Sequence, residues 1–91
     1  MAMIALQHKI DAERVVPSLD EVREKLDGTD GEIILDFSSV CRIDACALRA
    51  MEKLAAGAES KGVKLVLRGA STDVYRVLKL MKLTPRFSYL T

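Results

Sequence analysis

The sequence predicts a small single-domain α/β fold over residues 1–91, with about four strands and about three helices. Two short, almost continuously apolar runs, residues 33–37 and 63–67, have the pattern of strands buried on both faces of a parallel sheet. A stretch with apolar residues at helical spacing lies between them. Strand, long helix and strand form a βαβ unit, which predicts parallel strands with a right-handed crossover.

Length, charge and composition limit the classes of function. With 91 residues, 14 Lys and Arg, 13 Asp and Glu and a net charge of +1, the chain lacks the basic excess of a nucleic-acid-binding protein. The single histidine, His8, excludes mechanisms that need a histidine pair, and no segment reaches the ~20 apolar residues of a membrane span. Residues 1–10 do not resemble a signal peptide, and two cysteines are too few for a disulfide framework. We therefore expect a cytoplasmic chain that does not insert into a membrane. We expect it to bind no nucleic acid, no metal and no other cofactor.

The N-terminal third predicts one strand and one helix. From residue 4 to residue 10, apolar and polar residues alternate with the period of a half-buried strand. His8 interrupts the apolar face, and we expect it to lie at a sheet edge or to find a backbone partner rather than to act in catalysis. Ser18 and Glu21 fit a capping box at the start of a short helix, which Asp27-Gly28 ends.

The rest of the chain predicts two further helices and, after the strands at residues 33–37 and 63–67, one C-terminal segment that is a candidate strand. The long helix covers about residues 45–61 and ends at Gly62. A turn at residues 69–73 precedes the third helix, with Ser71, Thr72 or Asp73 as its cap, and Thr84-Pro85 ends that helix. Residues 87–90 either add a short edge strand or cover the core. The third helix has the clearest amphipathic pattern, formed by Val74, Val77, Leu78 and Met81.

Two stretches at the carboxyl ends of strands are candidates for function, because ligands and partners of open α/β sheets gather there. They are residues 38–46 and 68–73. Asp44 precedes the long helix and fits an N-cap, a role that is compatible with a recognition edge exposed to a protein partner. Ser38 and Ser39 are expected to be turn residues rather than nucleophiles, because no base lies near them in the sequence.

The cysteines and the basic residues of the third helix have a structural and a functional interpretation. Cys41 and Cys46 match neither a CxxC redox motif nor half of a zinc site, so we expect buried or half-buried structural thiols. A reactive thiol at Cys46 is the alternative, because a helix N-terminus stabilises thiolate. A basic outer face of the third helix is either solvated surface or a docking patch for an acidic partner; it comprises Arg76, Lys79, Lys82 and Arg86.

Residues 33–48, IILDFSSVCRIDACAL, resemble the central block of STAS domains, the family of sulfate transporters and anti-sigma factor antagonists. Residues 64–87 are similar to the second block of the family in order and spacing. The resemblance implies a small mixed sheet with helices mainly on one side, and work done by protein contact rather than catalysis. In the anti-sigma antagonists of the family, a serine or threonine just after the Asp is phosphorylated by a partner kinase. The phosphate adds a charge of about −1.5 to −2 and separates the partners.

The chain departs from the family pattern at the position of phosphorylation. Ala45 and Cys46, which follow Asp44, carry no hydroxyl group, Ala47 replaces the usual glycine, and Arg42 stands where an apolar or aromatic residue is common. The extra first strand of many relatives is also not expected here. We therefore interpret the chain as a bacterial-type regulatory domain that binds a protein and is not phosphorylated at the usual position. The residues expected to bind the partner are Ser38, Ser39, Arg42, Asp44, Ala45, Cys46 and Arg49.

Three partner or function classes stay open. The expected partner is an anti-sigma factor or a protein similar to a serine kinase. An accessory subunit of a membrane lipid-transport ATPase, or a scaffold in a signalling assembly, is the second interpretation, and a thiol redox sensor using Cys46 is the third. We do not expect an enzyme, since the sequence offers no nucleophile, base and orienting group that fit together.

Overall fold

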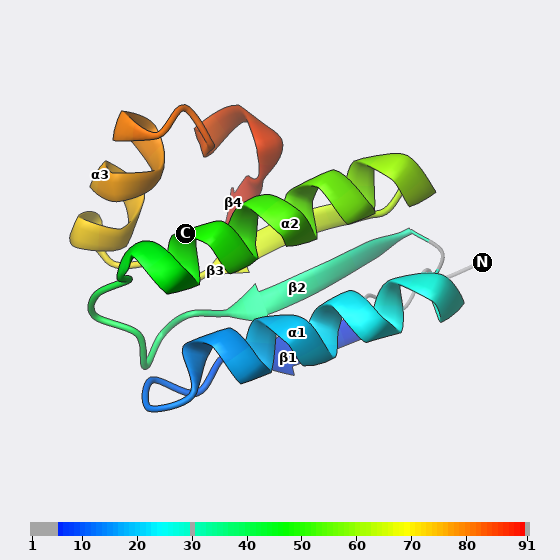
Figure 1. The fold of residues 1–91 in the computed structure, drawn as a ribbon, viewed down its shortest axis with the longest axis horizontal. Coiled ribbons are helices and arrows are strands. Elements are labelled where there is room, and N and C mark those ends of the chain that lie inside the picture. The colour runs from blue at the N-terminus through cyan, green and yellow to red at the C-terminus, as the bar shows by residue number, and fades with distance from the viewer. Residues whose placement is uncertain (1–5, 30, 91) are drawn as a thin grey trace.

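The computed structural model describes residues 6–29 and 31–90, which form one four-stranded sheet with three α-helices (Figure 1). Strands β1 (Leu6–Lys9), β2 (Glu32–Asp36), β3 (Lys64–Arg68) and β4 (Ser88–Leu90) lie in this order, and each pairs in parallel with the next. Helices α1 (Val15–Lys25), α2 (Ala45–Lys61) and α3 (Thr72–Leu80) connect them in turn. The predicted α/β class is confirmed. The described strands make a parallel sheet, however, whereas the resemblance implies a mixed one. Residues 1–5 lie outside the described part, and with them the start of the predicted first strand and any extra strand before it.

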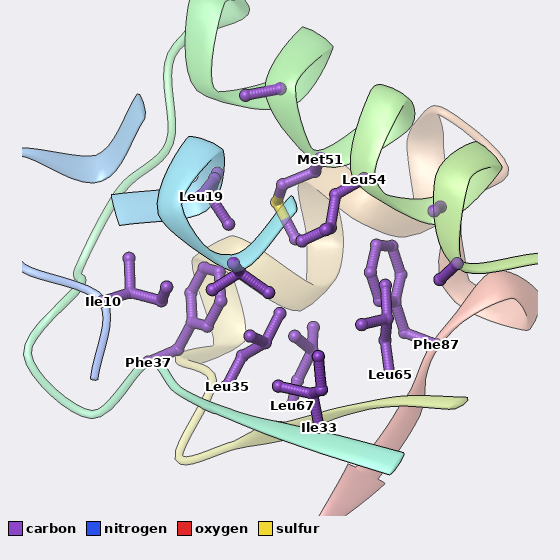
Figure 2. Close-up of a cluster of buried hydrophobic side chains, with 14 of the residues drawn as sticks. Ile10, Leu19, Ile33, Leu35, Phe37, Met51, Leu54, Leu65, Leu67 and Phe87 are labelled. Carbon is purple, nitrogen blue, oxygen red and sulfur yellow. The ribbon is translucent and has the colours of Figure 1, made fainter. Parts of the chain in front are cut away.

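The helices lie on one side of the sheet. Helices α1 and α2 run side by side across one face, and α3 lies beyond them toward the carboxyl ends of the strands (Figure 1). Alternate residues of the two central strands project into the core below these helices, and each is at most 2% exposed: Ile33, Leu35, Leu65 and Leu67 (Figure 2). The prediction that β2 is buried on both faces is wrong, because Ile34 is only half-buried. For β3 the same prediction holds at the centre of the strand, where Leu65, Val66 and Leu67 are all buried. In the described part of the chain, the connections between the strands cover a single face.

Helix α1 begins earlier than the sequence predicts. Its N-cap is Arg14, which makes no side-chain capping hydrogen bond, and Pro17 falls in the first turn, where a missing N–H costs nothing. Ser18 is buried in the helix, and its Oγ accepts a hydrogen bond from the N–H of Asp11 at 3.2 Å. The predicted capping box is therefore wrong. Ser18 binds the backbone of the loop before the helix, and the carboxylate of Glu21 faces His8 on β1.

His8 connects the edge strand β1 to α1. The Nζ of Lys25 lies 2.9 Å from His8 Nδ1, and a carboxylate oxygen of Glu21 lies 3.4 Å from Nε2. The prediction of a sheet-edge position is confirmed, whereas its partners are side chains of α1 rather than backbone groups.

Helix α2 has the predicted bounds, and helix α3 starts where predicted but ends earlier. The Oγ of Ser71 caps α3 by accepting the N–H of Val74 at 3.2 Å. The helix ends at Leu80 and not at Thr84-Pro85, because Lys82 adopts a left-handed conformation with φ 59°. The N–H of Leu83 then donates to the carbonyl of Leu78 at 2.8 Å, which closes a Schellman turn.

Replacing Lys82 by glycine is expected to stabilise the protein. The left-handed conformation costs a residue with a Cβ about 1 kcal/mol, and glycine adopts it freely. Lys82→Gly should therefore raise the free energy of unfolding, measured by urea denaturation, by about 1 kcal/mol. The matched control is Lys79→Gly inside α3, which should lower it by about 1 kcal/mol. Loss of stability in both variants would contradict the assigned role of Lys82.

Candidate functional site

The predicted partner-binding residues form one exposed edge of the molecule. They lie in the β2–α2 loop, residues 37–44, and in the first turns of α2, close to the β3–α3 loop, residues 69–71 (Figure 1). All seven side chains are exposed: Ser38, Ser39, Arg42, Asp44, Ala45, Cys46 and Arg49. We call this set the loop–helix edge.

The β2–α2 loop is fixed by buried anchors and by hydrogen bonds. Phe37 is buried, its N–H donates to the carbonyl of Arg68 at 2.8 Å, and its own carbonyl accepts from Val40 at 2.9 Å. The carboxylate of Asp36 accepts the N–H of Ser38 at 2.9 Å. Hydrogen bonds from Ser38, with the charges of Arg68 and Lys9, lower the pKa of Asp36 below its usual value, so this carboxylate is ionised at neutral pH. Ser38 itself is a turn residue, as predicted.

The β3–α3 loop is joined to the β2–α2 loop by two close contacts. Gly69 has φ +70°, and a Cβ at this position would lie 3.0 Å from the Cβ and 3.2 Å from the Cα of Ser38. The Oγ of Ser71 donates to the carbonyl of Cys41 at 3.1 Å. Spacing along the chain does not predict these contacts, since they join residues about 30 positions apart. The two stretches singled out in the sequence therefore form one structural unit.

Asp44 caps helix α2, as predicted. Its Oδ1 accepts the N–H of Ala47 at 2.8 Å. Ala45 and Cys46 follow at the exposed N-terminus of a helix of 17 residues, where the partial positive charge of the helix dipole is concentrated. The prediction of buried thiols is wrong, because Cys41 and Cys46 are both free and exposed. Within residues 6–29 and 31–90, no cluster of His, Cys, Asp and Glu side chains suits a metal ion.

Two shallow hollows flank Arg42 and Ile43. One, of about 530 Å³, lies between the starts of α1 and α2, and its apolar lining includes Val15, Val16, Pro17 and Ala47. The other, of about 330 Å³, lies between the loop and α3, and its lining includes Asp73, Arg76, Val77 and Leu80. The sequence does not predict these contributions from α1 and α3. The position of Leu80 outside the amphipathic stripe of α3 is nevertheless a signal that it is exposed, here by 76%.

The predicted basic face of the third helix is smaller than expected. Arg76, Lys79 and Lys82 are exposed on α3 and just after it. Arg86 lies beyond the helix in a 3-10 turn, where its guanidinium donates to both carboxylate oxygens of Glu59 on α2, at 2.8 and 3.2 Å. Arg86 therefore attaches the C-terminal segment to α2 and does not extend a basic surface.

Comparison with known proteins gives a family and a solved structure of similar fold. A family model described as STAS domain matches residues 1–90, which extends the resemblance seen in residues 33–87 to the N-terminal third. A solved structure from Thermotoga maritima, described as a candidate anti-sigma factor antagonist, superposes with a TM-score of 0.68 at 25% identity, covering 98% of this chain and 76% of that one. No curated protein sequence matches. Among the described helices, none has the length and apolar character needed to cross a membrane. The chain belongs to the STAS domain family.

Proposed function

We propose that this STAS domain is a non-catalytic regulatory module that binds its protein partner constitutively through the loop–helix edge. The observation that carries the proposal is the start of α2, where the capping Asp44 is followed by exposed Ala45 and Cys46, neither of which has a hydroxyl group. The likeness to an anti-sigma factor antagonist supports a regulatory role through protein contact. The partner that this proposal favours is an anti-sigma factor or a related serine kinase.

The electrostatics of the edge explain why this binding is constitutive. The N-terminus of α2 carries partial positive charge, and exposed Arg42 and Arg49 add two full charges beside it. A phosphate at this position would lower the local charge by about 1.5 to 2. Because Ala45 and Cys46 cannot accept a phosphate as a serine does, the edge keeps its charge and stays suited to acidic groups of a partner.

Intact-mass spectrometry tests directly whether the chain is phosphorylated. After incubation with the cognate serine kinase and ATP, the intact mass of the wild-type chain should not change. The variant Ala45→Ser, which restores the hydroxyl group, is the matched positive control and should gain one phosphate. Phosphate on Ser38, Ser39 or Ser71 of the wild type, together with loss of partner binding, would overturn the proposal.

Placing an acidic side chain at the helix start should weaken partner binding. In Ala45→Glu, a carboxylate occupies the edge where relatives carry the phosphate, so the affinity for the captured partner should fall at least about tenfold. The measurement is affinity capture from the source cells, followed by titration of the captured protein. Ala56→Glu, the same exchange at an exposed position of the same helix, is the control and should bind normally. Equal affinity of Ala45→Glu and the wild type would place the interface elsewhere.

The identity of the captured protein separates the alternative partners. An anti-sigma factor or kinase supports the proposal, whereas a subunit of a lipid-transport ATPase or a large signalling assembly supports the accessory or scaffold role. Each of these uses protein contact at an exposed surface, so the Ala45→Glu and Ala56→Glu pair applies to each.

The exposure of Cys46 favours thiol sensing as a second candidate function. A sensor thiol at a helix N-terminus reacts faster than an ordinary exposed thiol. Cys41, also exposed and only a few residues away, provides the internal standard. Kinetics of alkylation at neutral pH for Cys46→Ser and Cys41→Ser measure each thiol alone. A rate at Cys46 that is no higher than the rate at Cys41 would eliminate this candidate.

A further inference from the structure

The sheet face opposite helices α1 and α2, which we call the open face, carries an ordered pattern of charge. Its β2 residues are Glu32, Ile34 and Asp36, and its β3 residues are Lys64, Val66 and Arg68. Lys64 and Arg68 are exposed, and the β2 residues are half-buried. The open face therefore has an acidic strand directly beside a basic strand, with an apolar residue at the middle of each.

The register of the strands aligns these residues in rows. Glu32 pairs with Lys64, Ile34 with Val66, and Asp36 with Arg68. The sign of the charge therefore changes across the line between β2 and β3, while the apolar row lies between the two charged rows. Such a pattern is its own complement when it is turned over about that line.

We propose that two copies of this chain associate through their open faces, related by a two-fold axis that runs parallel to the strands between β2 and β3. This axis places Glu32 opposite Lys64 of the second copy and Asp36 opposite Arg68 of the second copy. It also places Ile34 over Val66 of the second copy, so that every facing pair on the two central strands is either oppositely charged or apolar. Closed two-fold dimers with identical patches on both subunits are the commonest homo-oligomers.

The same pattern excludes the other simple two-fold arrangement. An axis perpendicular to the strands reverses their direction and brings Glu32 of one copy toward Asp36 of the other. Like charges would then face each other on both central strands, which costs several-fold in affinity per pair. The parallel axis also agrees with aligned packing of sheets, in which the strands of the two layers lie within about 30° of one another and the layers about 10 Å apart.

The ends of the open face add apolar contact without a charge conflict. Leu90 of β4 is 47% exposed, and the proposed axis places it over the aliphatic stem of Lys9 on β1 of the second copy. Val66 is only 4% exposed, so Ile34 and Leu90 supply most of the newly buried apolar surface. Because four short strands bury less than the ~800 Å² per partner of a standard interface, the dimer should be weak and sensitive to salt. The loop–helix edge is not part of this contact, and the inference does not depend on the proposed function.

Sedimentation velocity of the full chain tests the association. At low ionic strength, the mean sedimentation coefficient should rise with protein concentration from the monomer value toward the dimer value. At about 0.5 M salt, where charges are screened beyond a few ångströms, the rise should be much smaller. Monomer at every concentration in low salt would overturn the proposal.

Charge reversal tests the geometry. Glu32→Lys and Lys64→Glu each place two like-charged pairs in the homodimer, so each dissociation constant should rise at least about tenfold. An equimolar mixture of the two variants forms a heterodimer in which both pairs are again oppositely charged, so the mixture should associate as the wild type does. The single-chain exchange Glu32→Lys with Lys64→Glu keeps opposite charges both within the sheet and across the dimer, and should also associate.

The control is Lys53→Glu on α2, which has the same change in net charge as Lys64→Glu but lies on the helix side of the molecule. It should leave association unchanged, and circular dichroism verifies that every variant is folded. Association of Glu32→Lys alone at the wild-type level, or a mixture of the two single variants that stays monomeric, would contradict the proposed axis. If Lys53→Glu weakened association as much as Lys64→Glu does, net charge alone would explain the effect, and the proposal would be overturned as well.

Discussion

Phe37→Ala is expected to lower the free energy of unfolding by about 3 to 5 kcal/mol, because it removes an aromatic ring from a fully buried position and leaves a cavity. Phe37 is 0% exposed, and its ring stands on the helix side of the sheet among Ile10, Leu19 and Leu35 (Figure 2). Since small domains are stable by only about 5 to 15 kcal/mol, this one exchange removes a large share of the total.

Urea denaturation of Phe37→Ala measures this loss. Leu80→Ala is the control, because Leu80 is 76% exposed and its truncation should change the free energy of unfolding by no more than about 0.5 kcal/mol. Phe37 also anchors the start of the β2–α2 loop through its backbone contact with Arg68. A loss below about 1 kcal/mol would show that the core closes around the missing ring at little cost, contrary to this expectation.

Gly69→Ala is expected to lower the free energy of unfolding by about 2 to 3 kcal/mol, from two causes that act at the same residue. The backbone at Gly69 has φ +70°, which strains any residue with a Cβ, and the added Cβ would press against both the Cβ and the Cα of Ser38. The Cα cannot rotate away, so one of the two loops must shift. Partner binding through the loop–helix edge should therefore weaken together with stability.

Two further variants separate these causes. Gly28→Ala is the control for loss of a glycine, since nothing lies within 4 Å of its added Cβ, and it should change the free energy of unfolding little. Gly69→Ala combined with Ser38→Gly removes the contact with the Ser38 Cβ and should recover part of the loss, while the backbone strain stays. No recovery in the double variant would mean that the Ser38 Cβ contributes nothing to the loss, which then comes from backbone strain and from the contact with the Cα of residue 38.

Features that depend on residues close together in sequence were predicted well. Helix α2 starts after Asp44 and ends at Gly62 as expected, because a capping carboxylate and a left-handed glycine act within one turn of the helix. The capping box at Ser18 was wrong for a physical reason: its hydroxyl is buried and holds Asp11, and a tertiary contact outweighs a local preference. The end of α3 was also wrong, because a left-handed lysine is rare and a proline a few residues later was the stronger signal.

The structure places the predicted partner-binding residues along one exposed edge, whereas the sequence does not predict the surroundings of that edge. The residues from Ser38 to Arg49 are contiguous along the chain, so one loop and one helix start suffice to bring them together. The contacts of Gly69 with Ser38 and of Ser71 with Cys41 join segments that are far apart in sequence, and no periodic pattern encodes them. The prediction of buried cysteines is wrong for the same reason, since the exposure of a side chain depends on which neighbours the fold places around it.

Periodicity, caps and turn residues along this chain were enough to predict the α/β order of elements and the bounds of the long helix. The residue identities alone show that no hydroxyl group follows Asp44. Folding decided which surfaces are free. The helices cover one face of the sheet and leave Glu32 and Lys64 side by side on the other, and α3 lies beside the β2–α2 loop. The reason is physical: helix caps and apolar periods are interactions within a few residues, whereas a free surface is defined by what the rest of the chain does not cover.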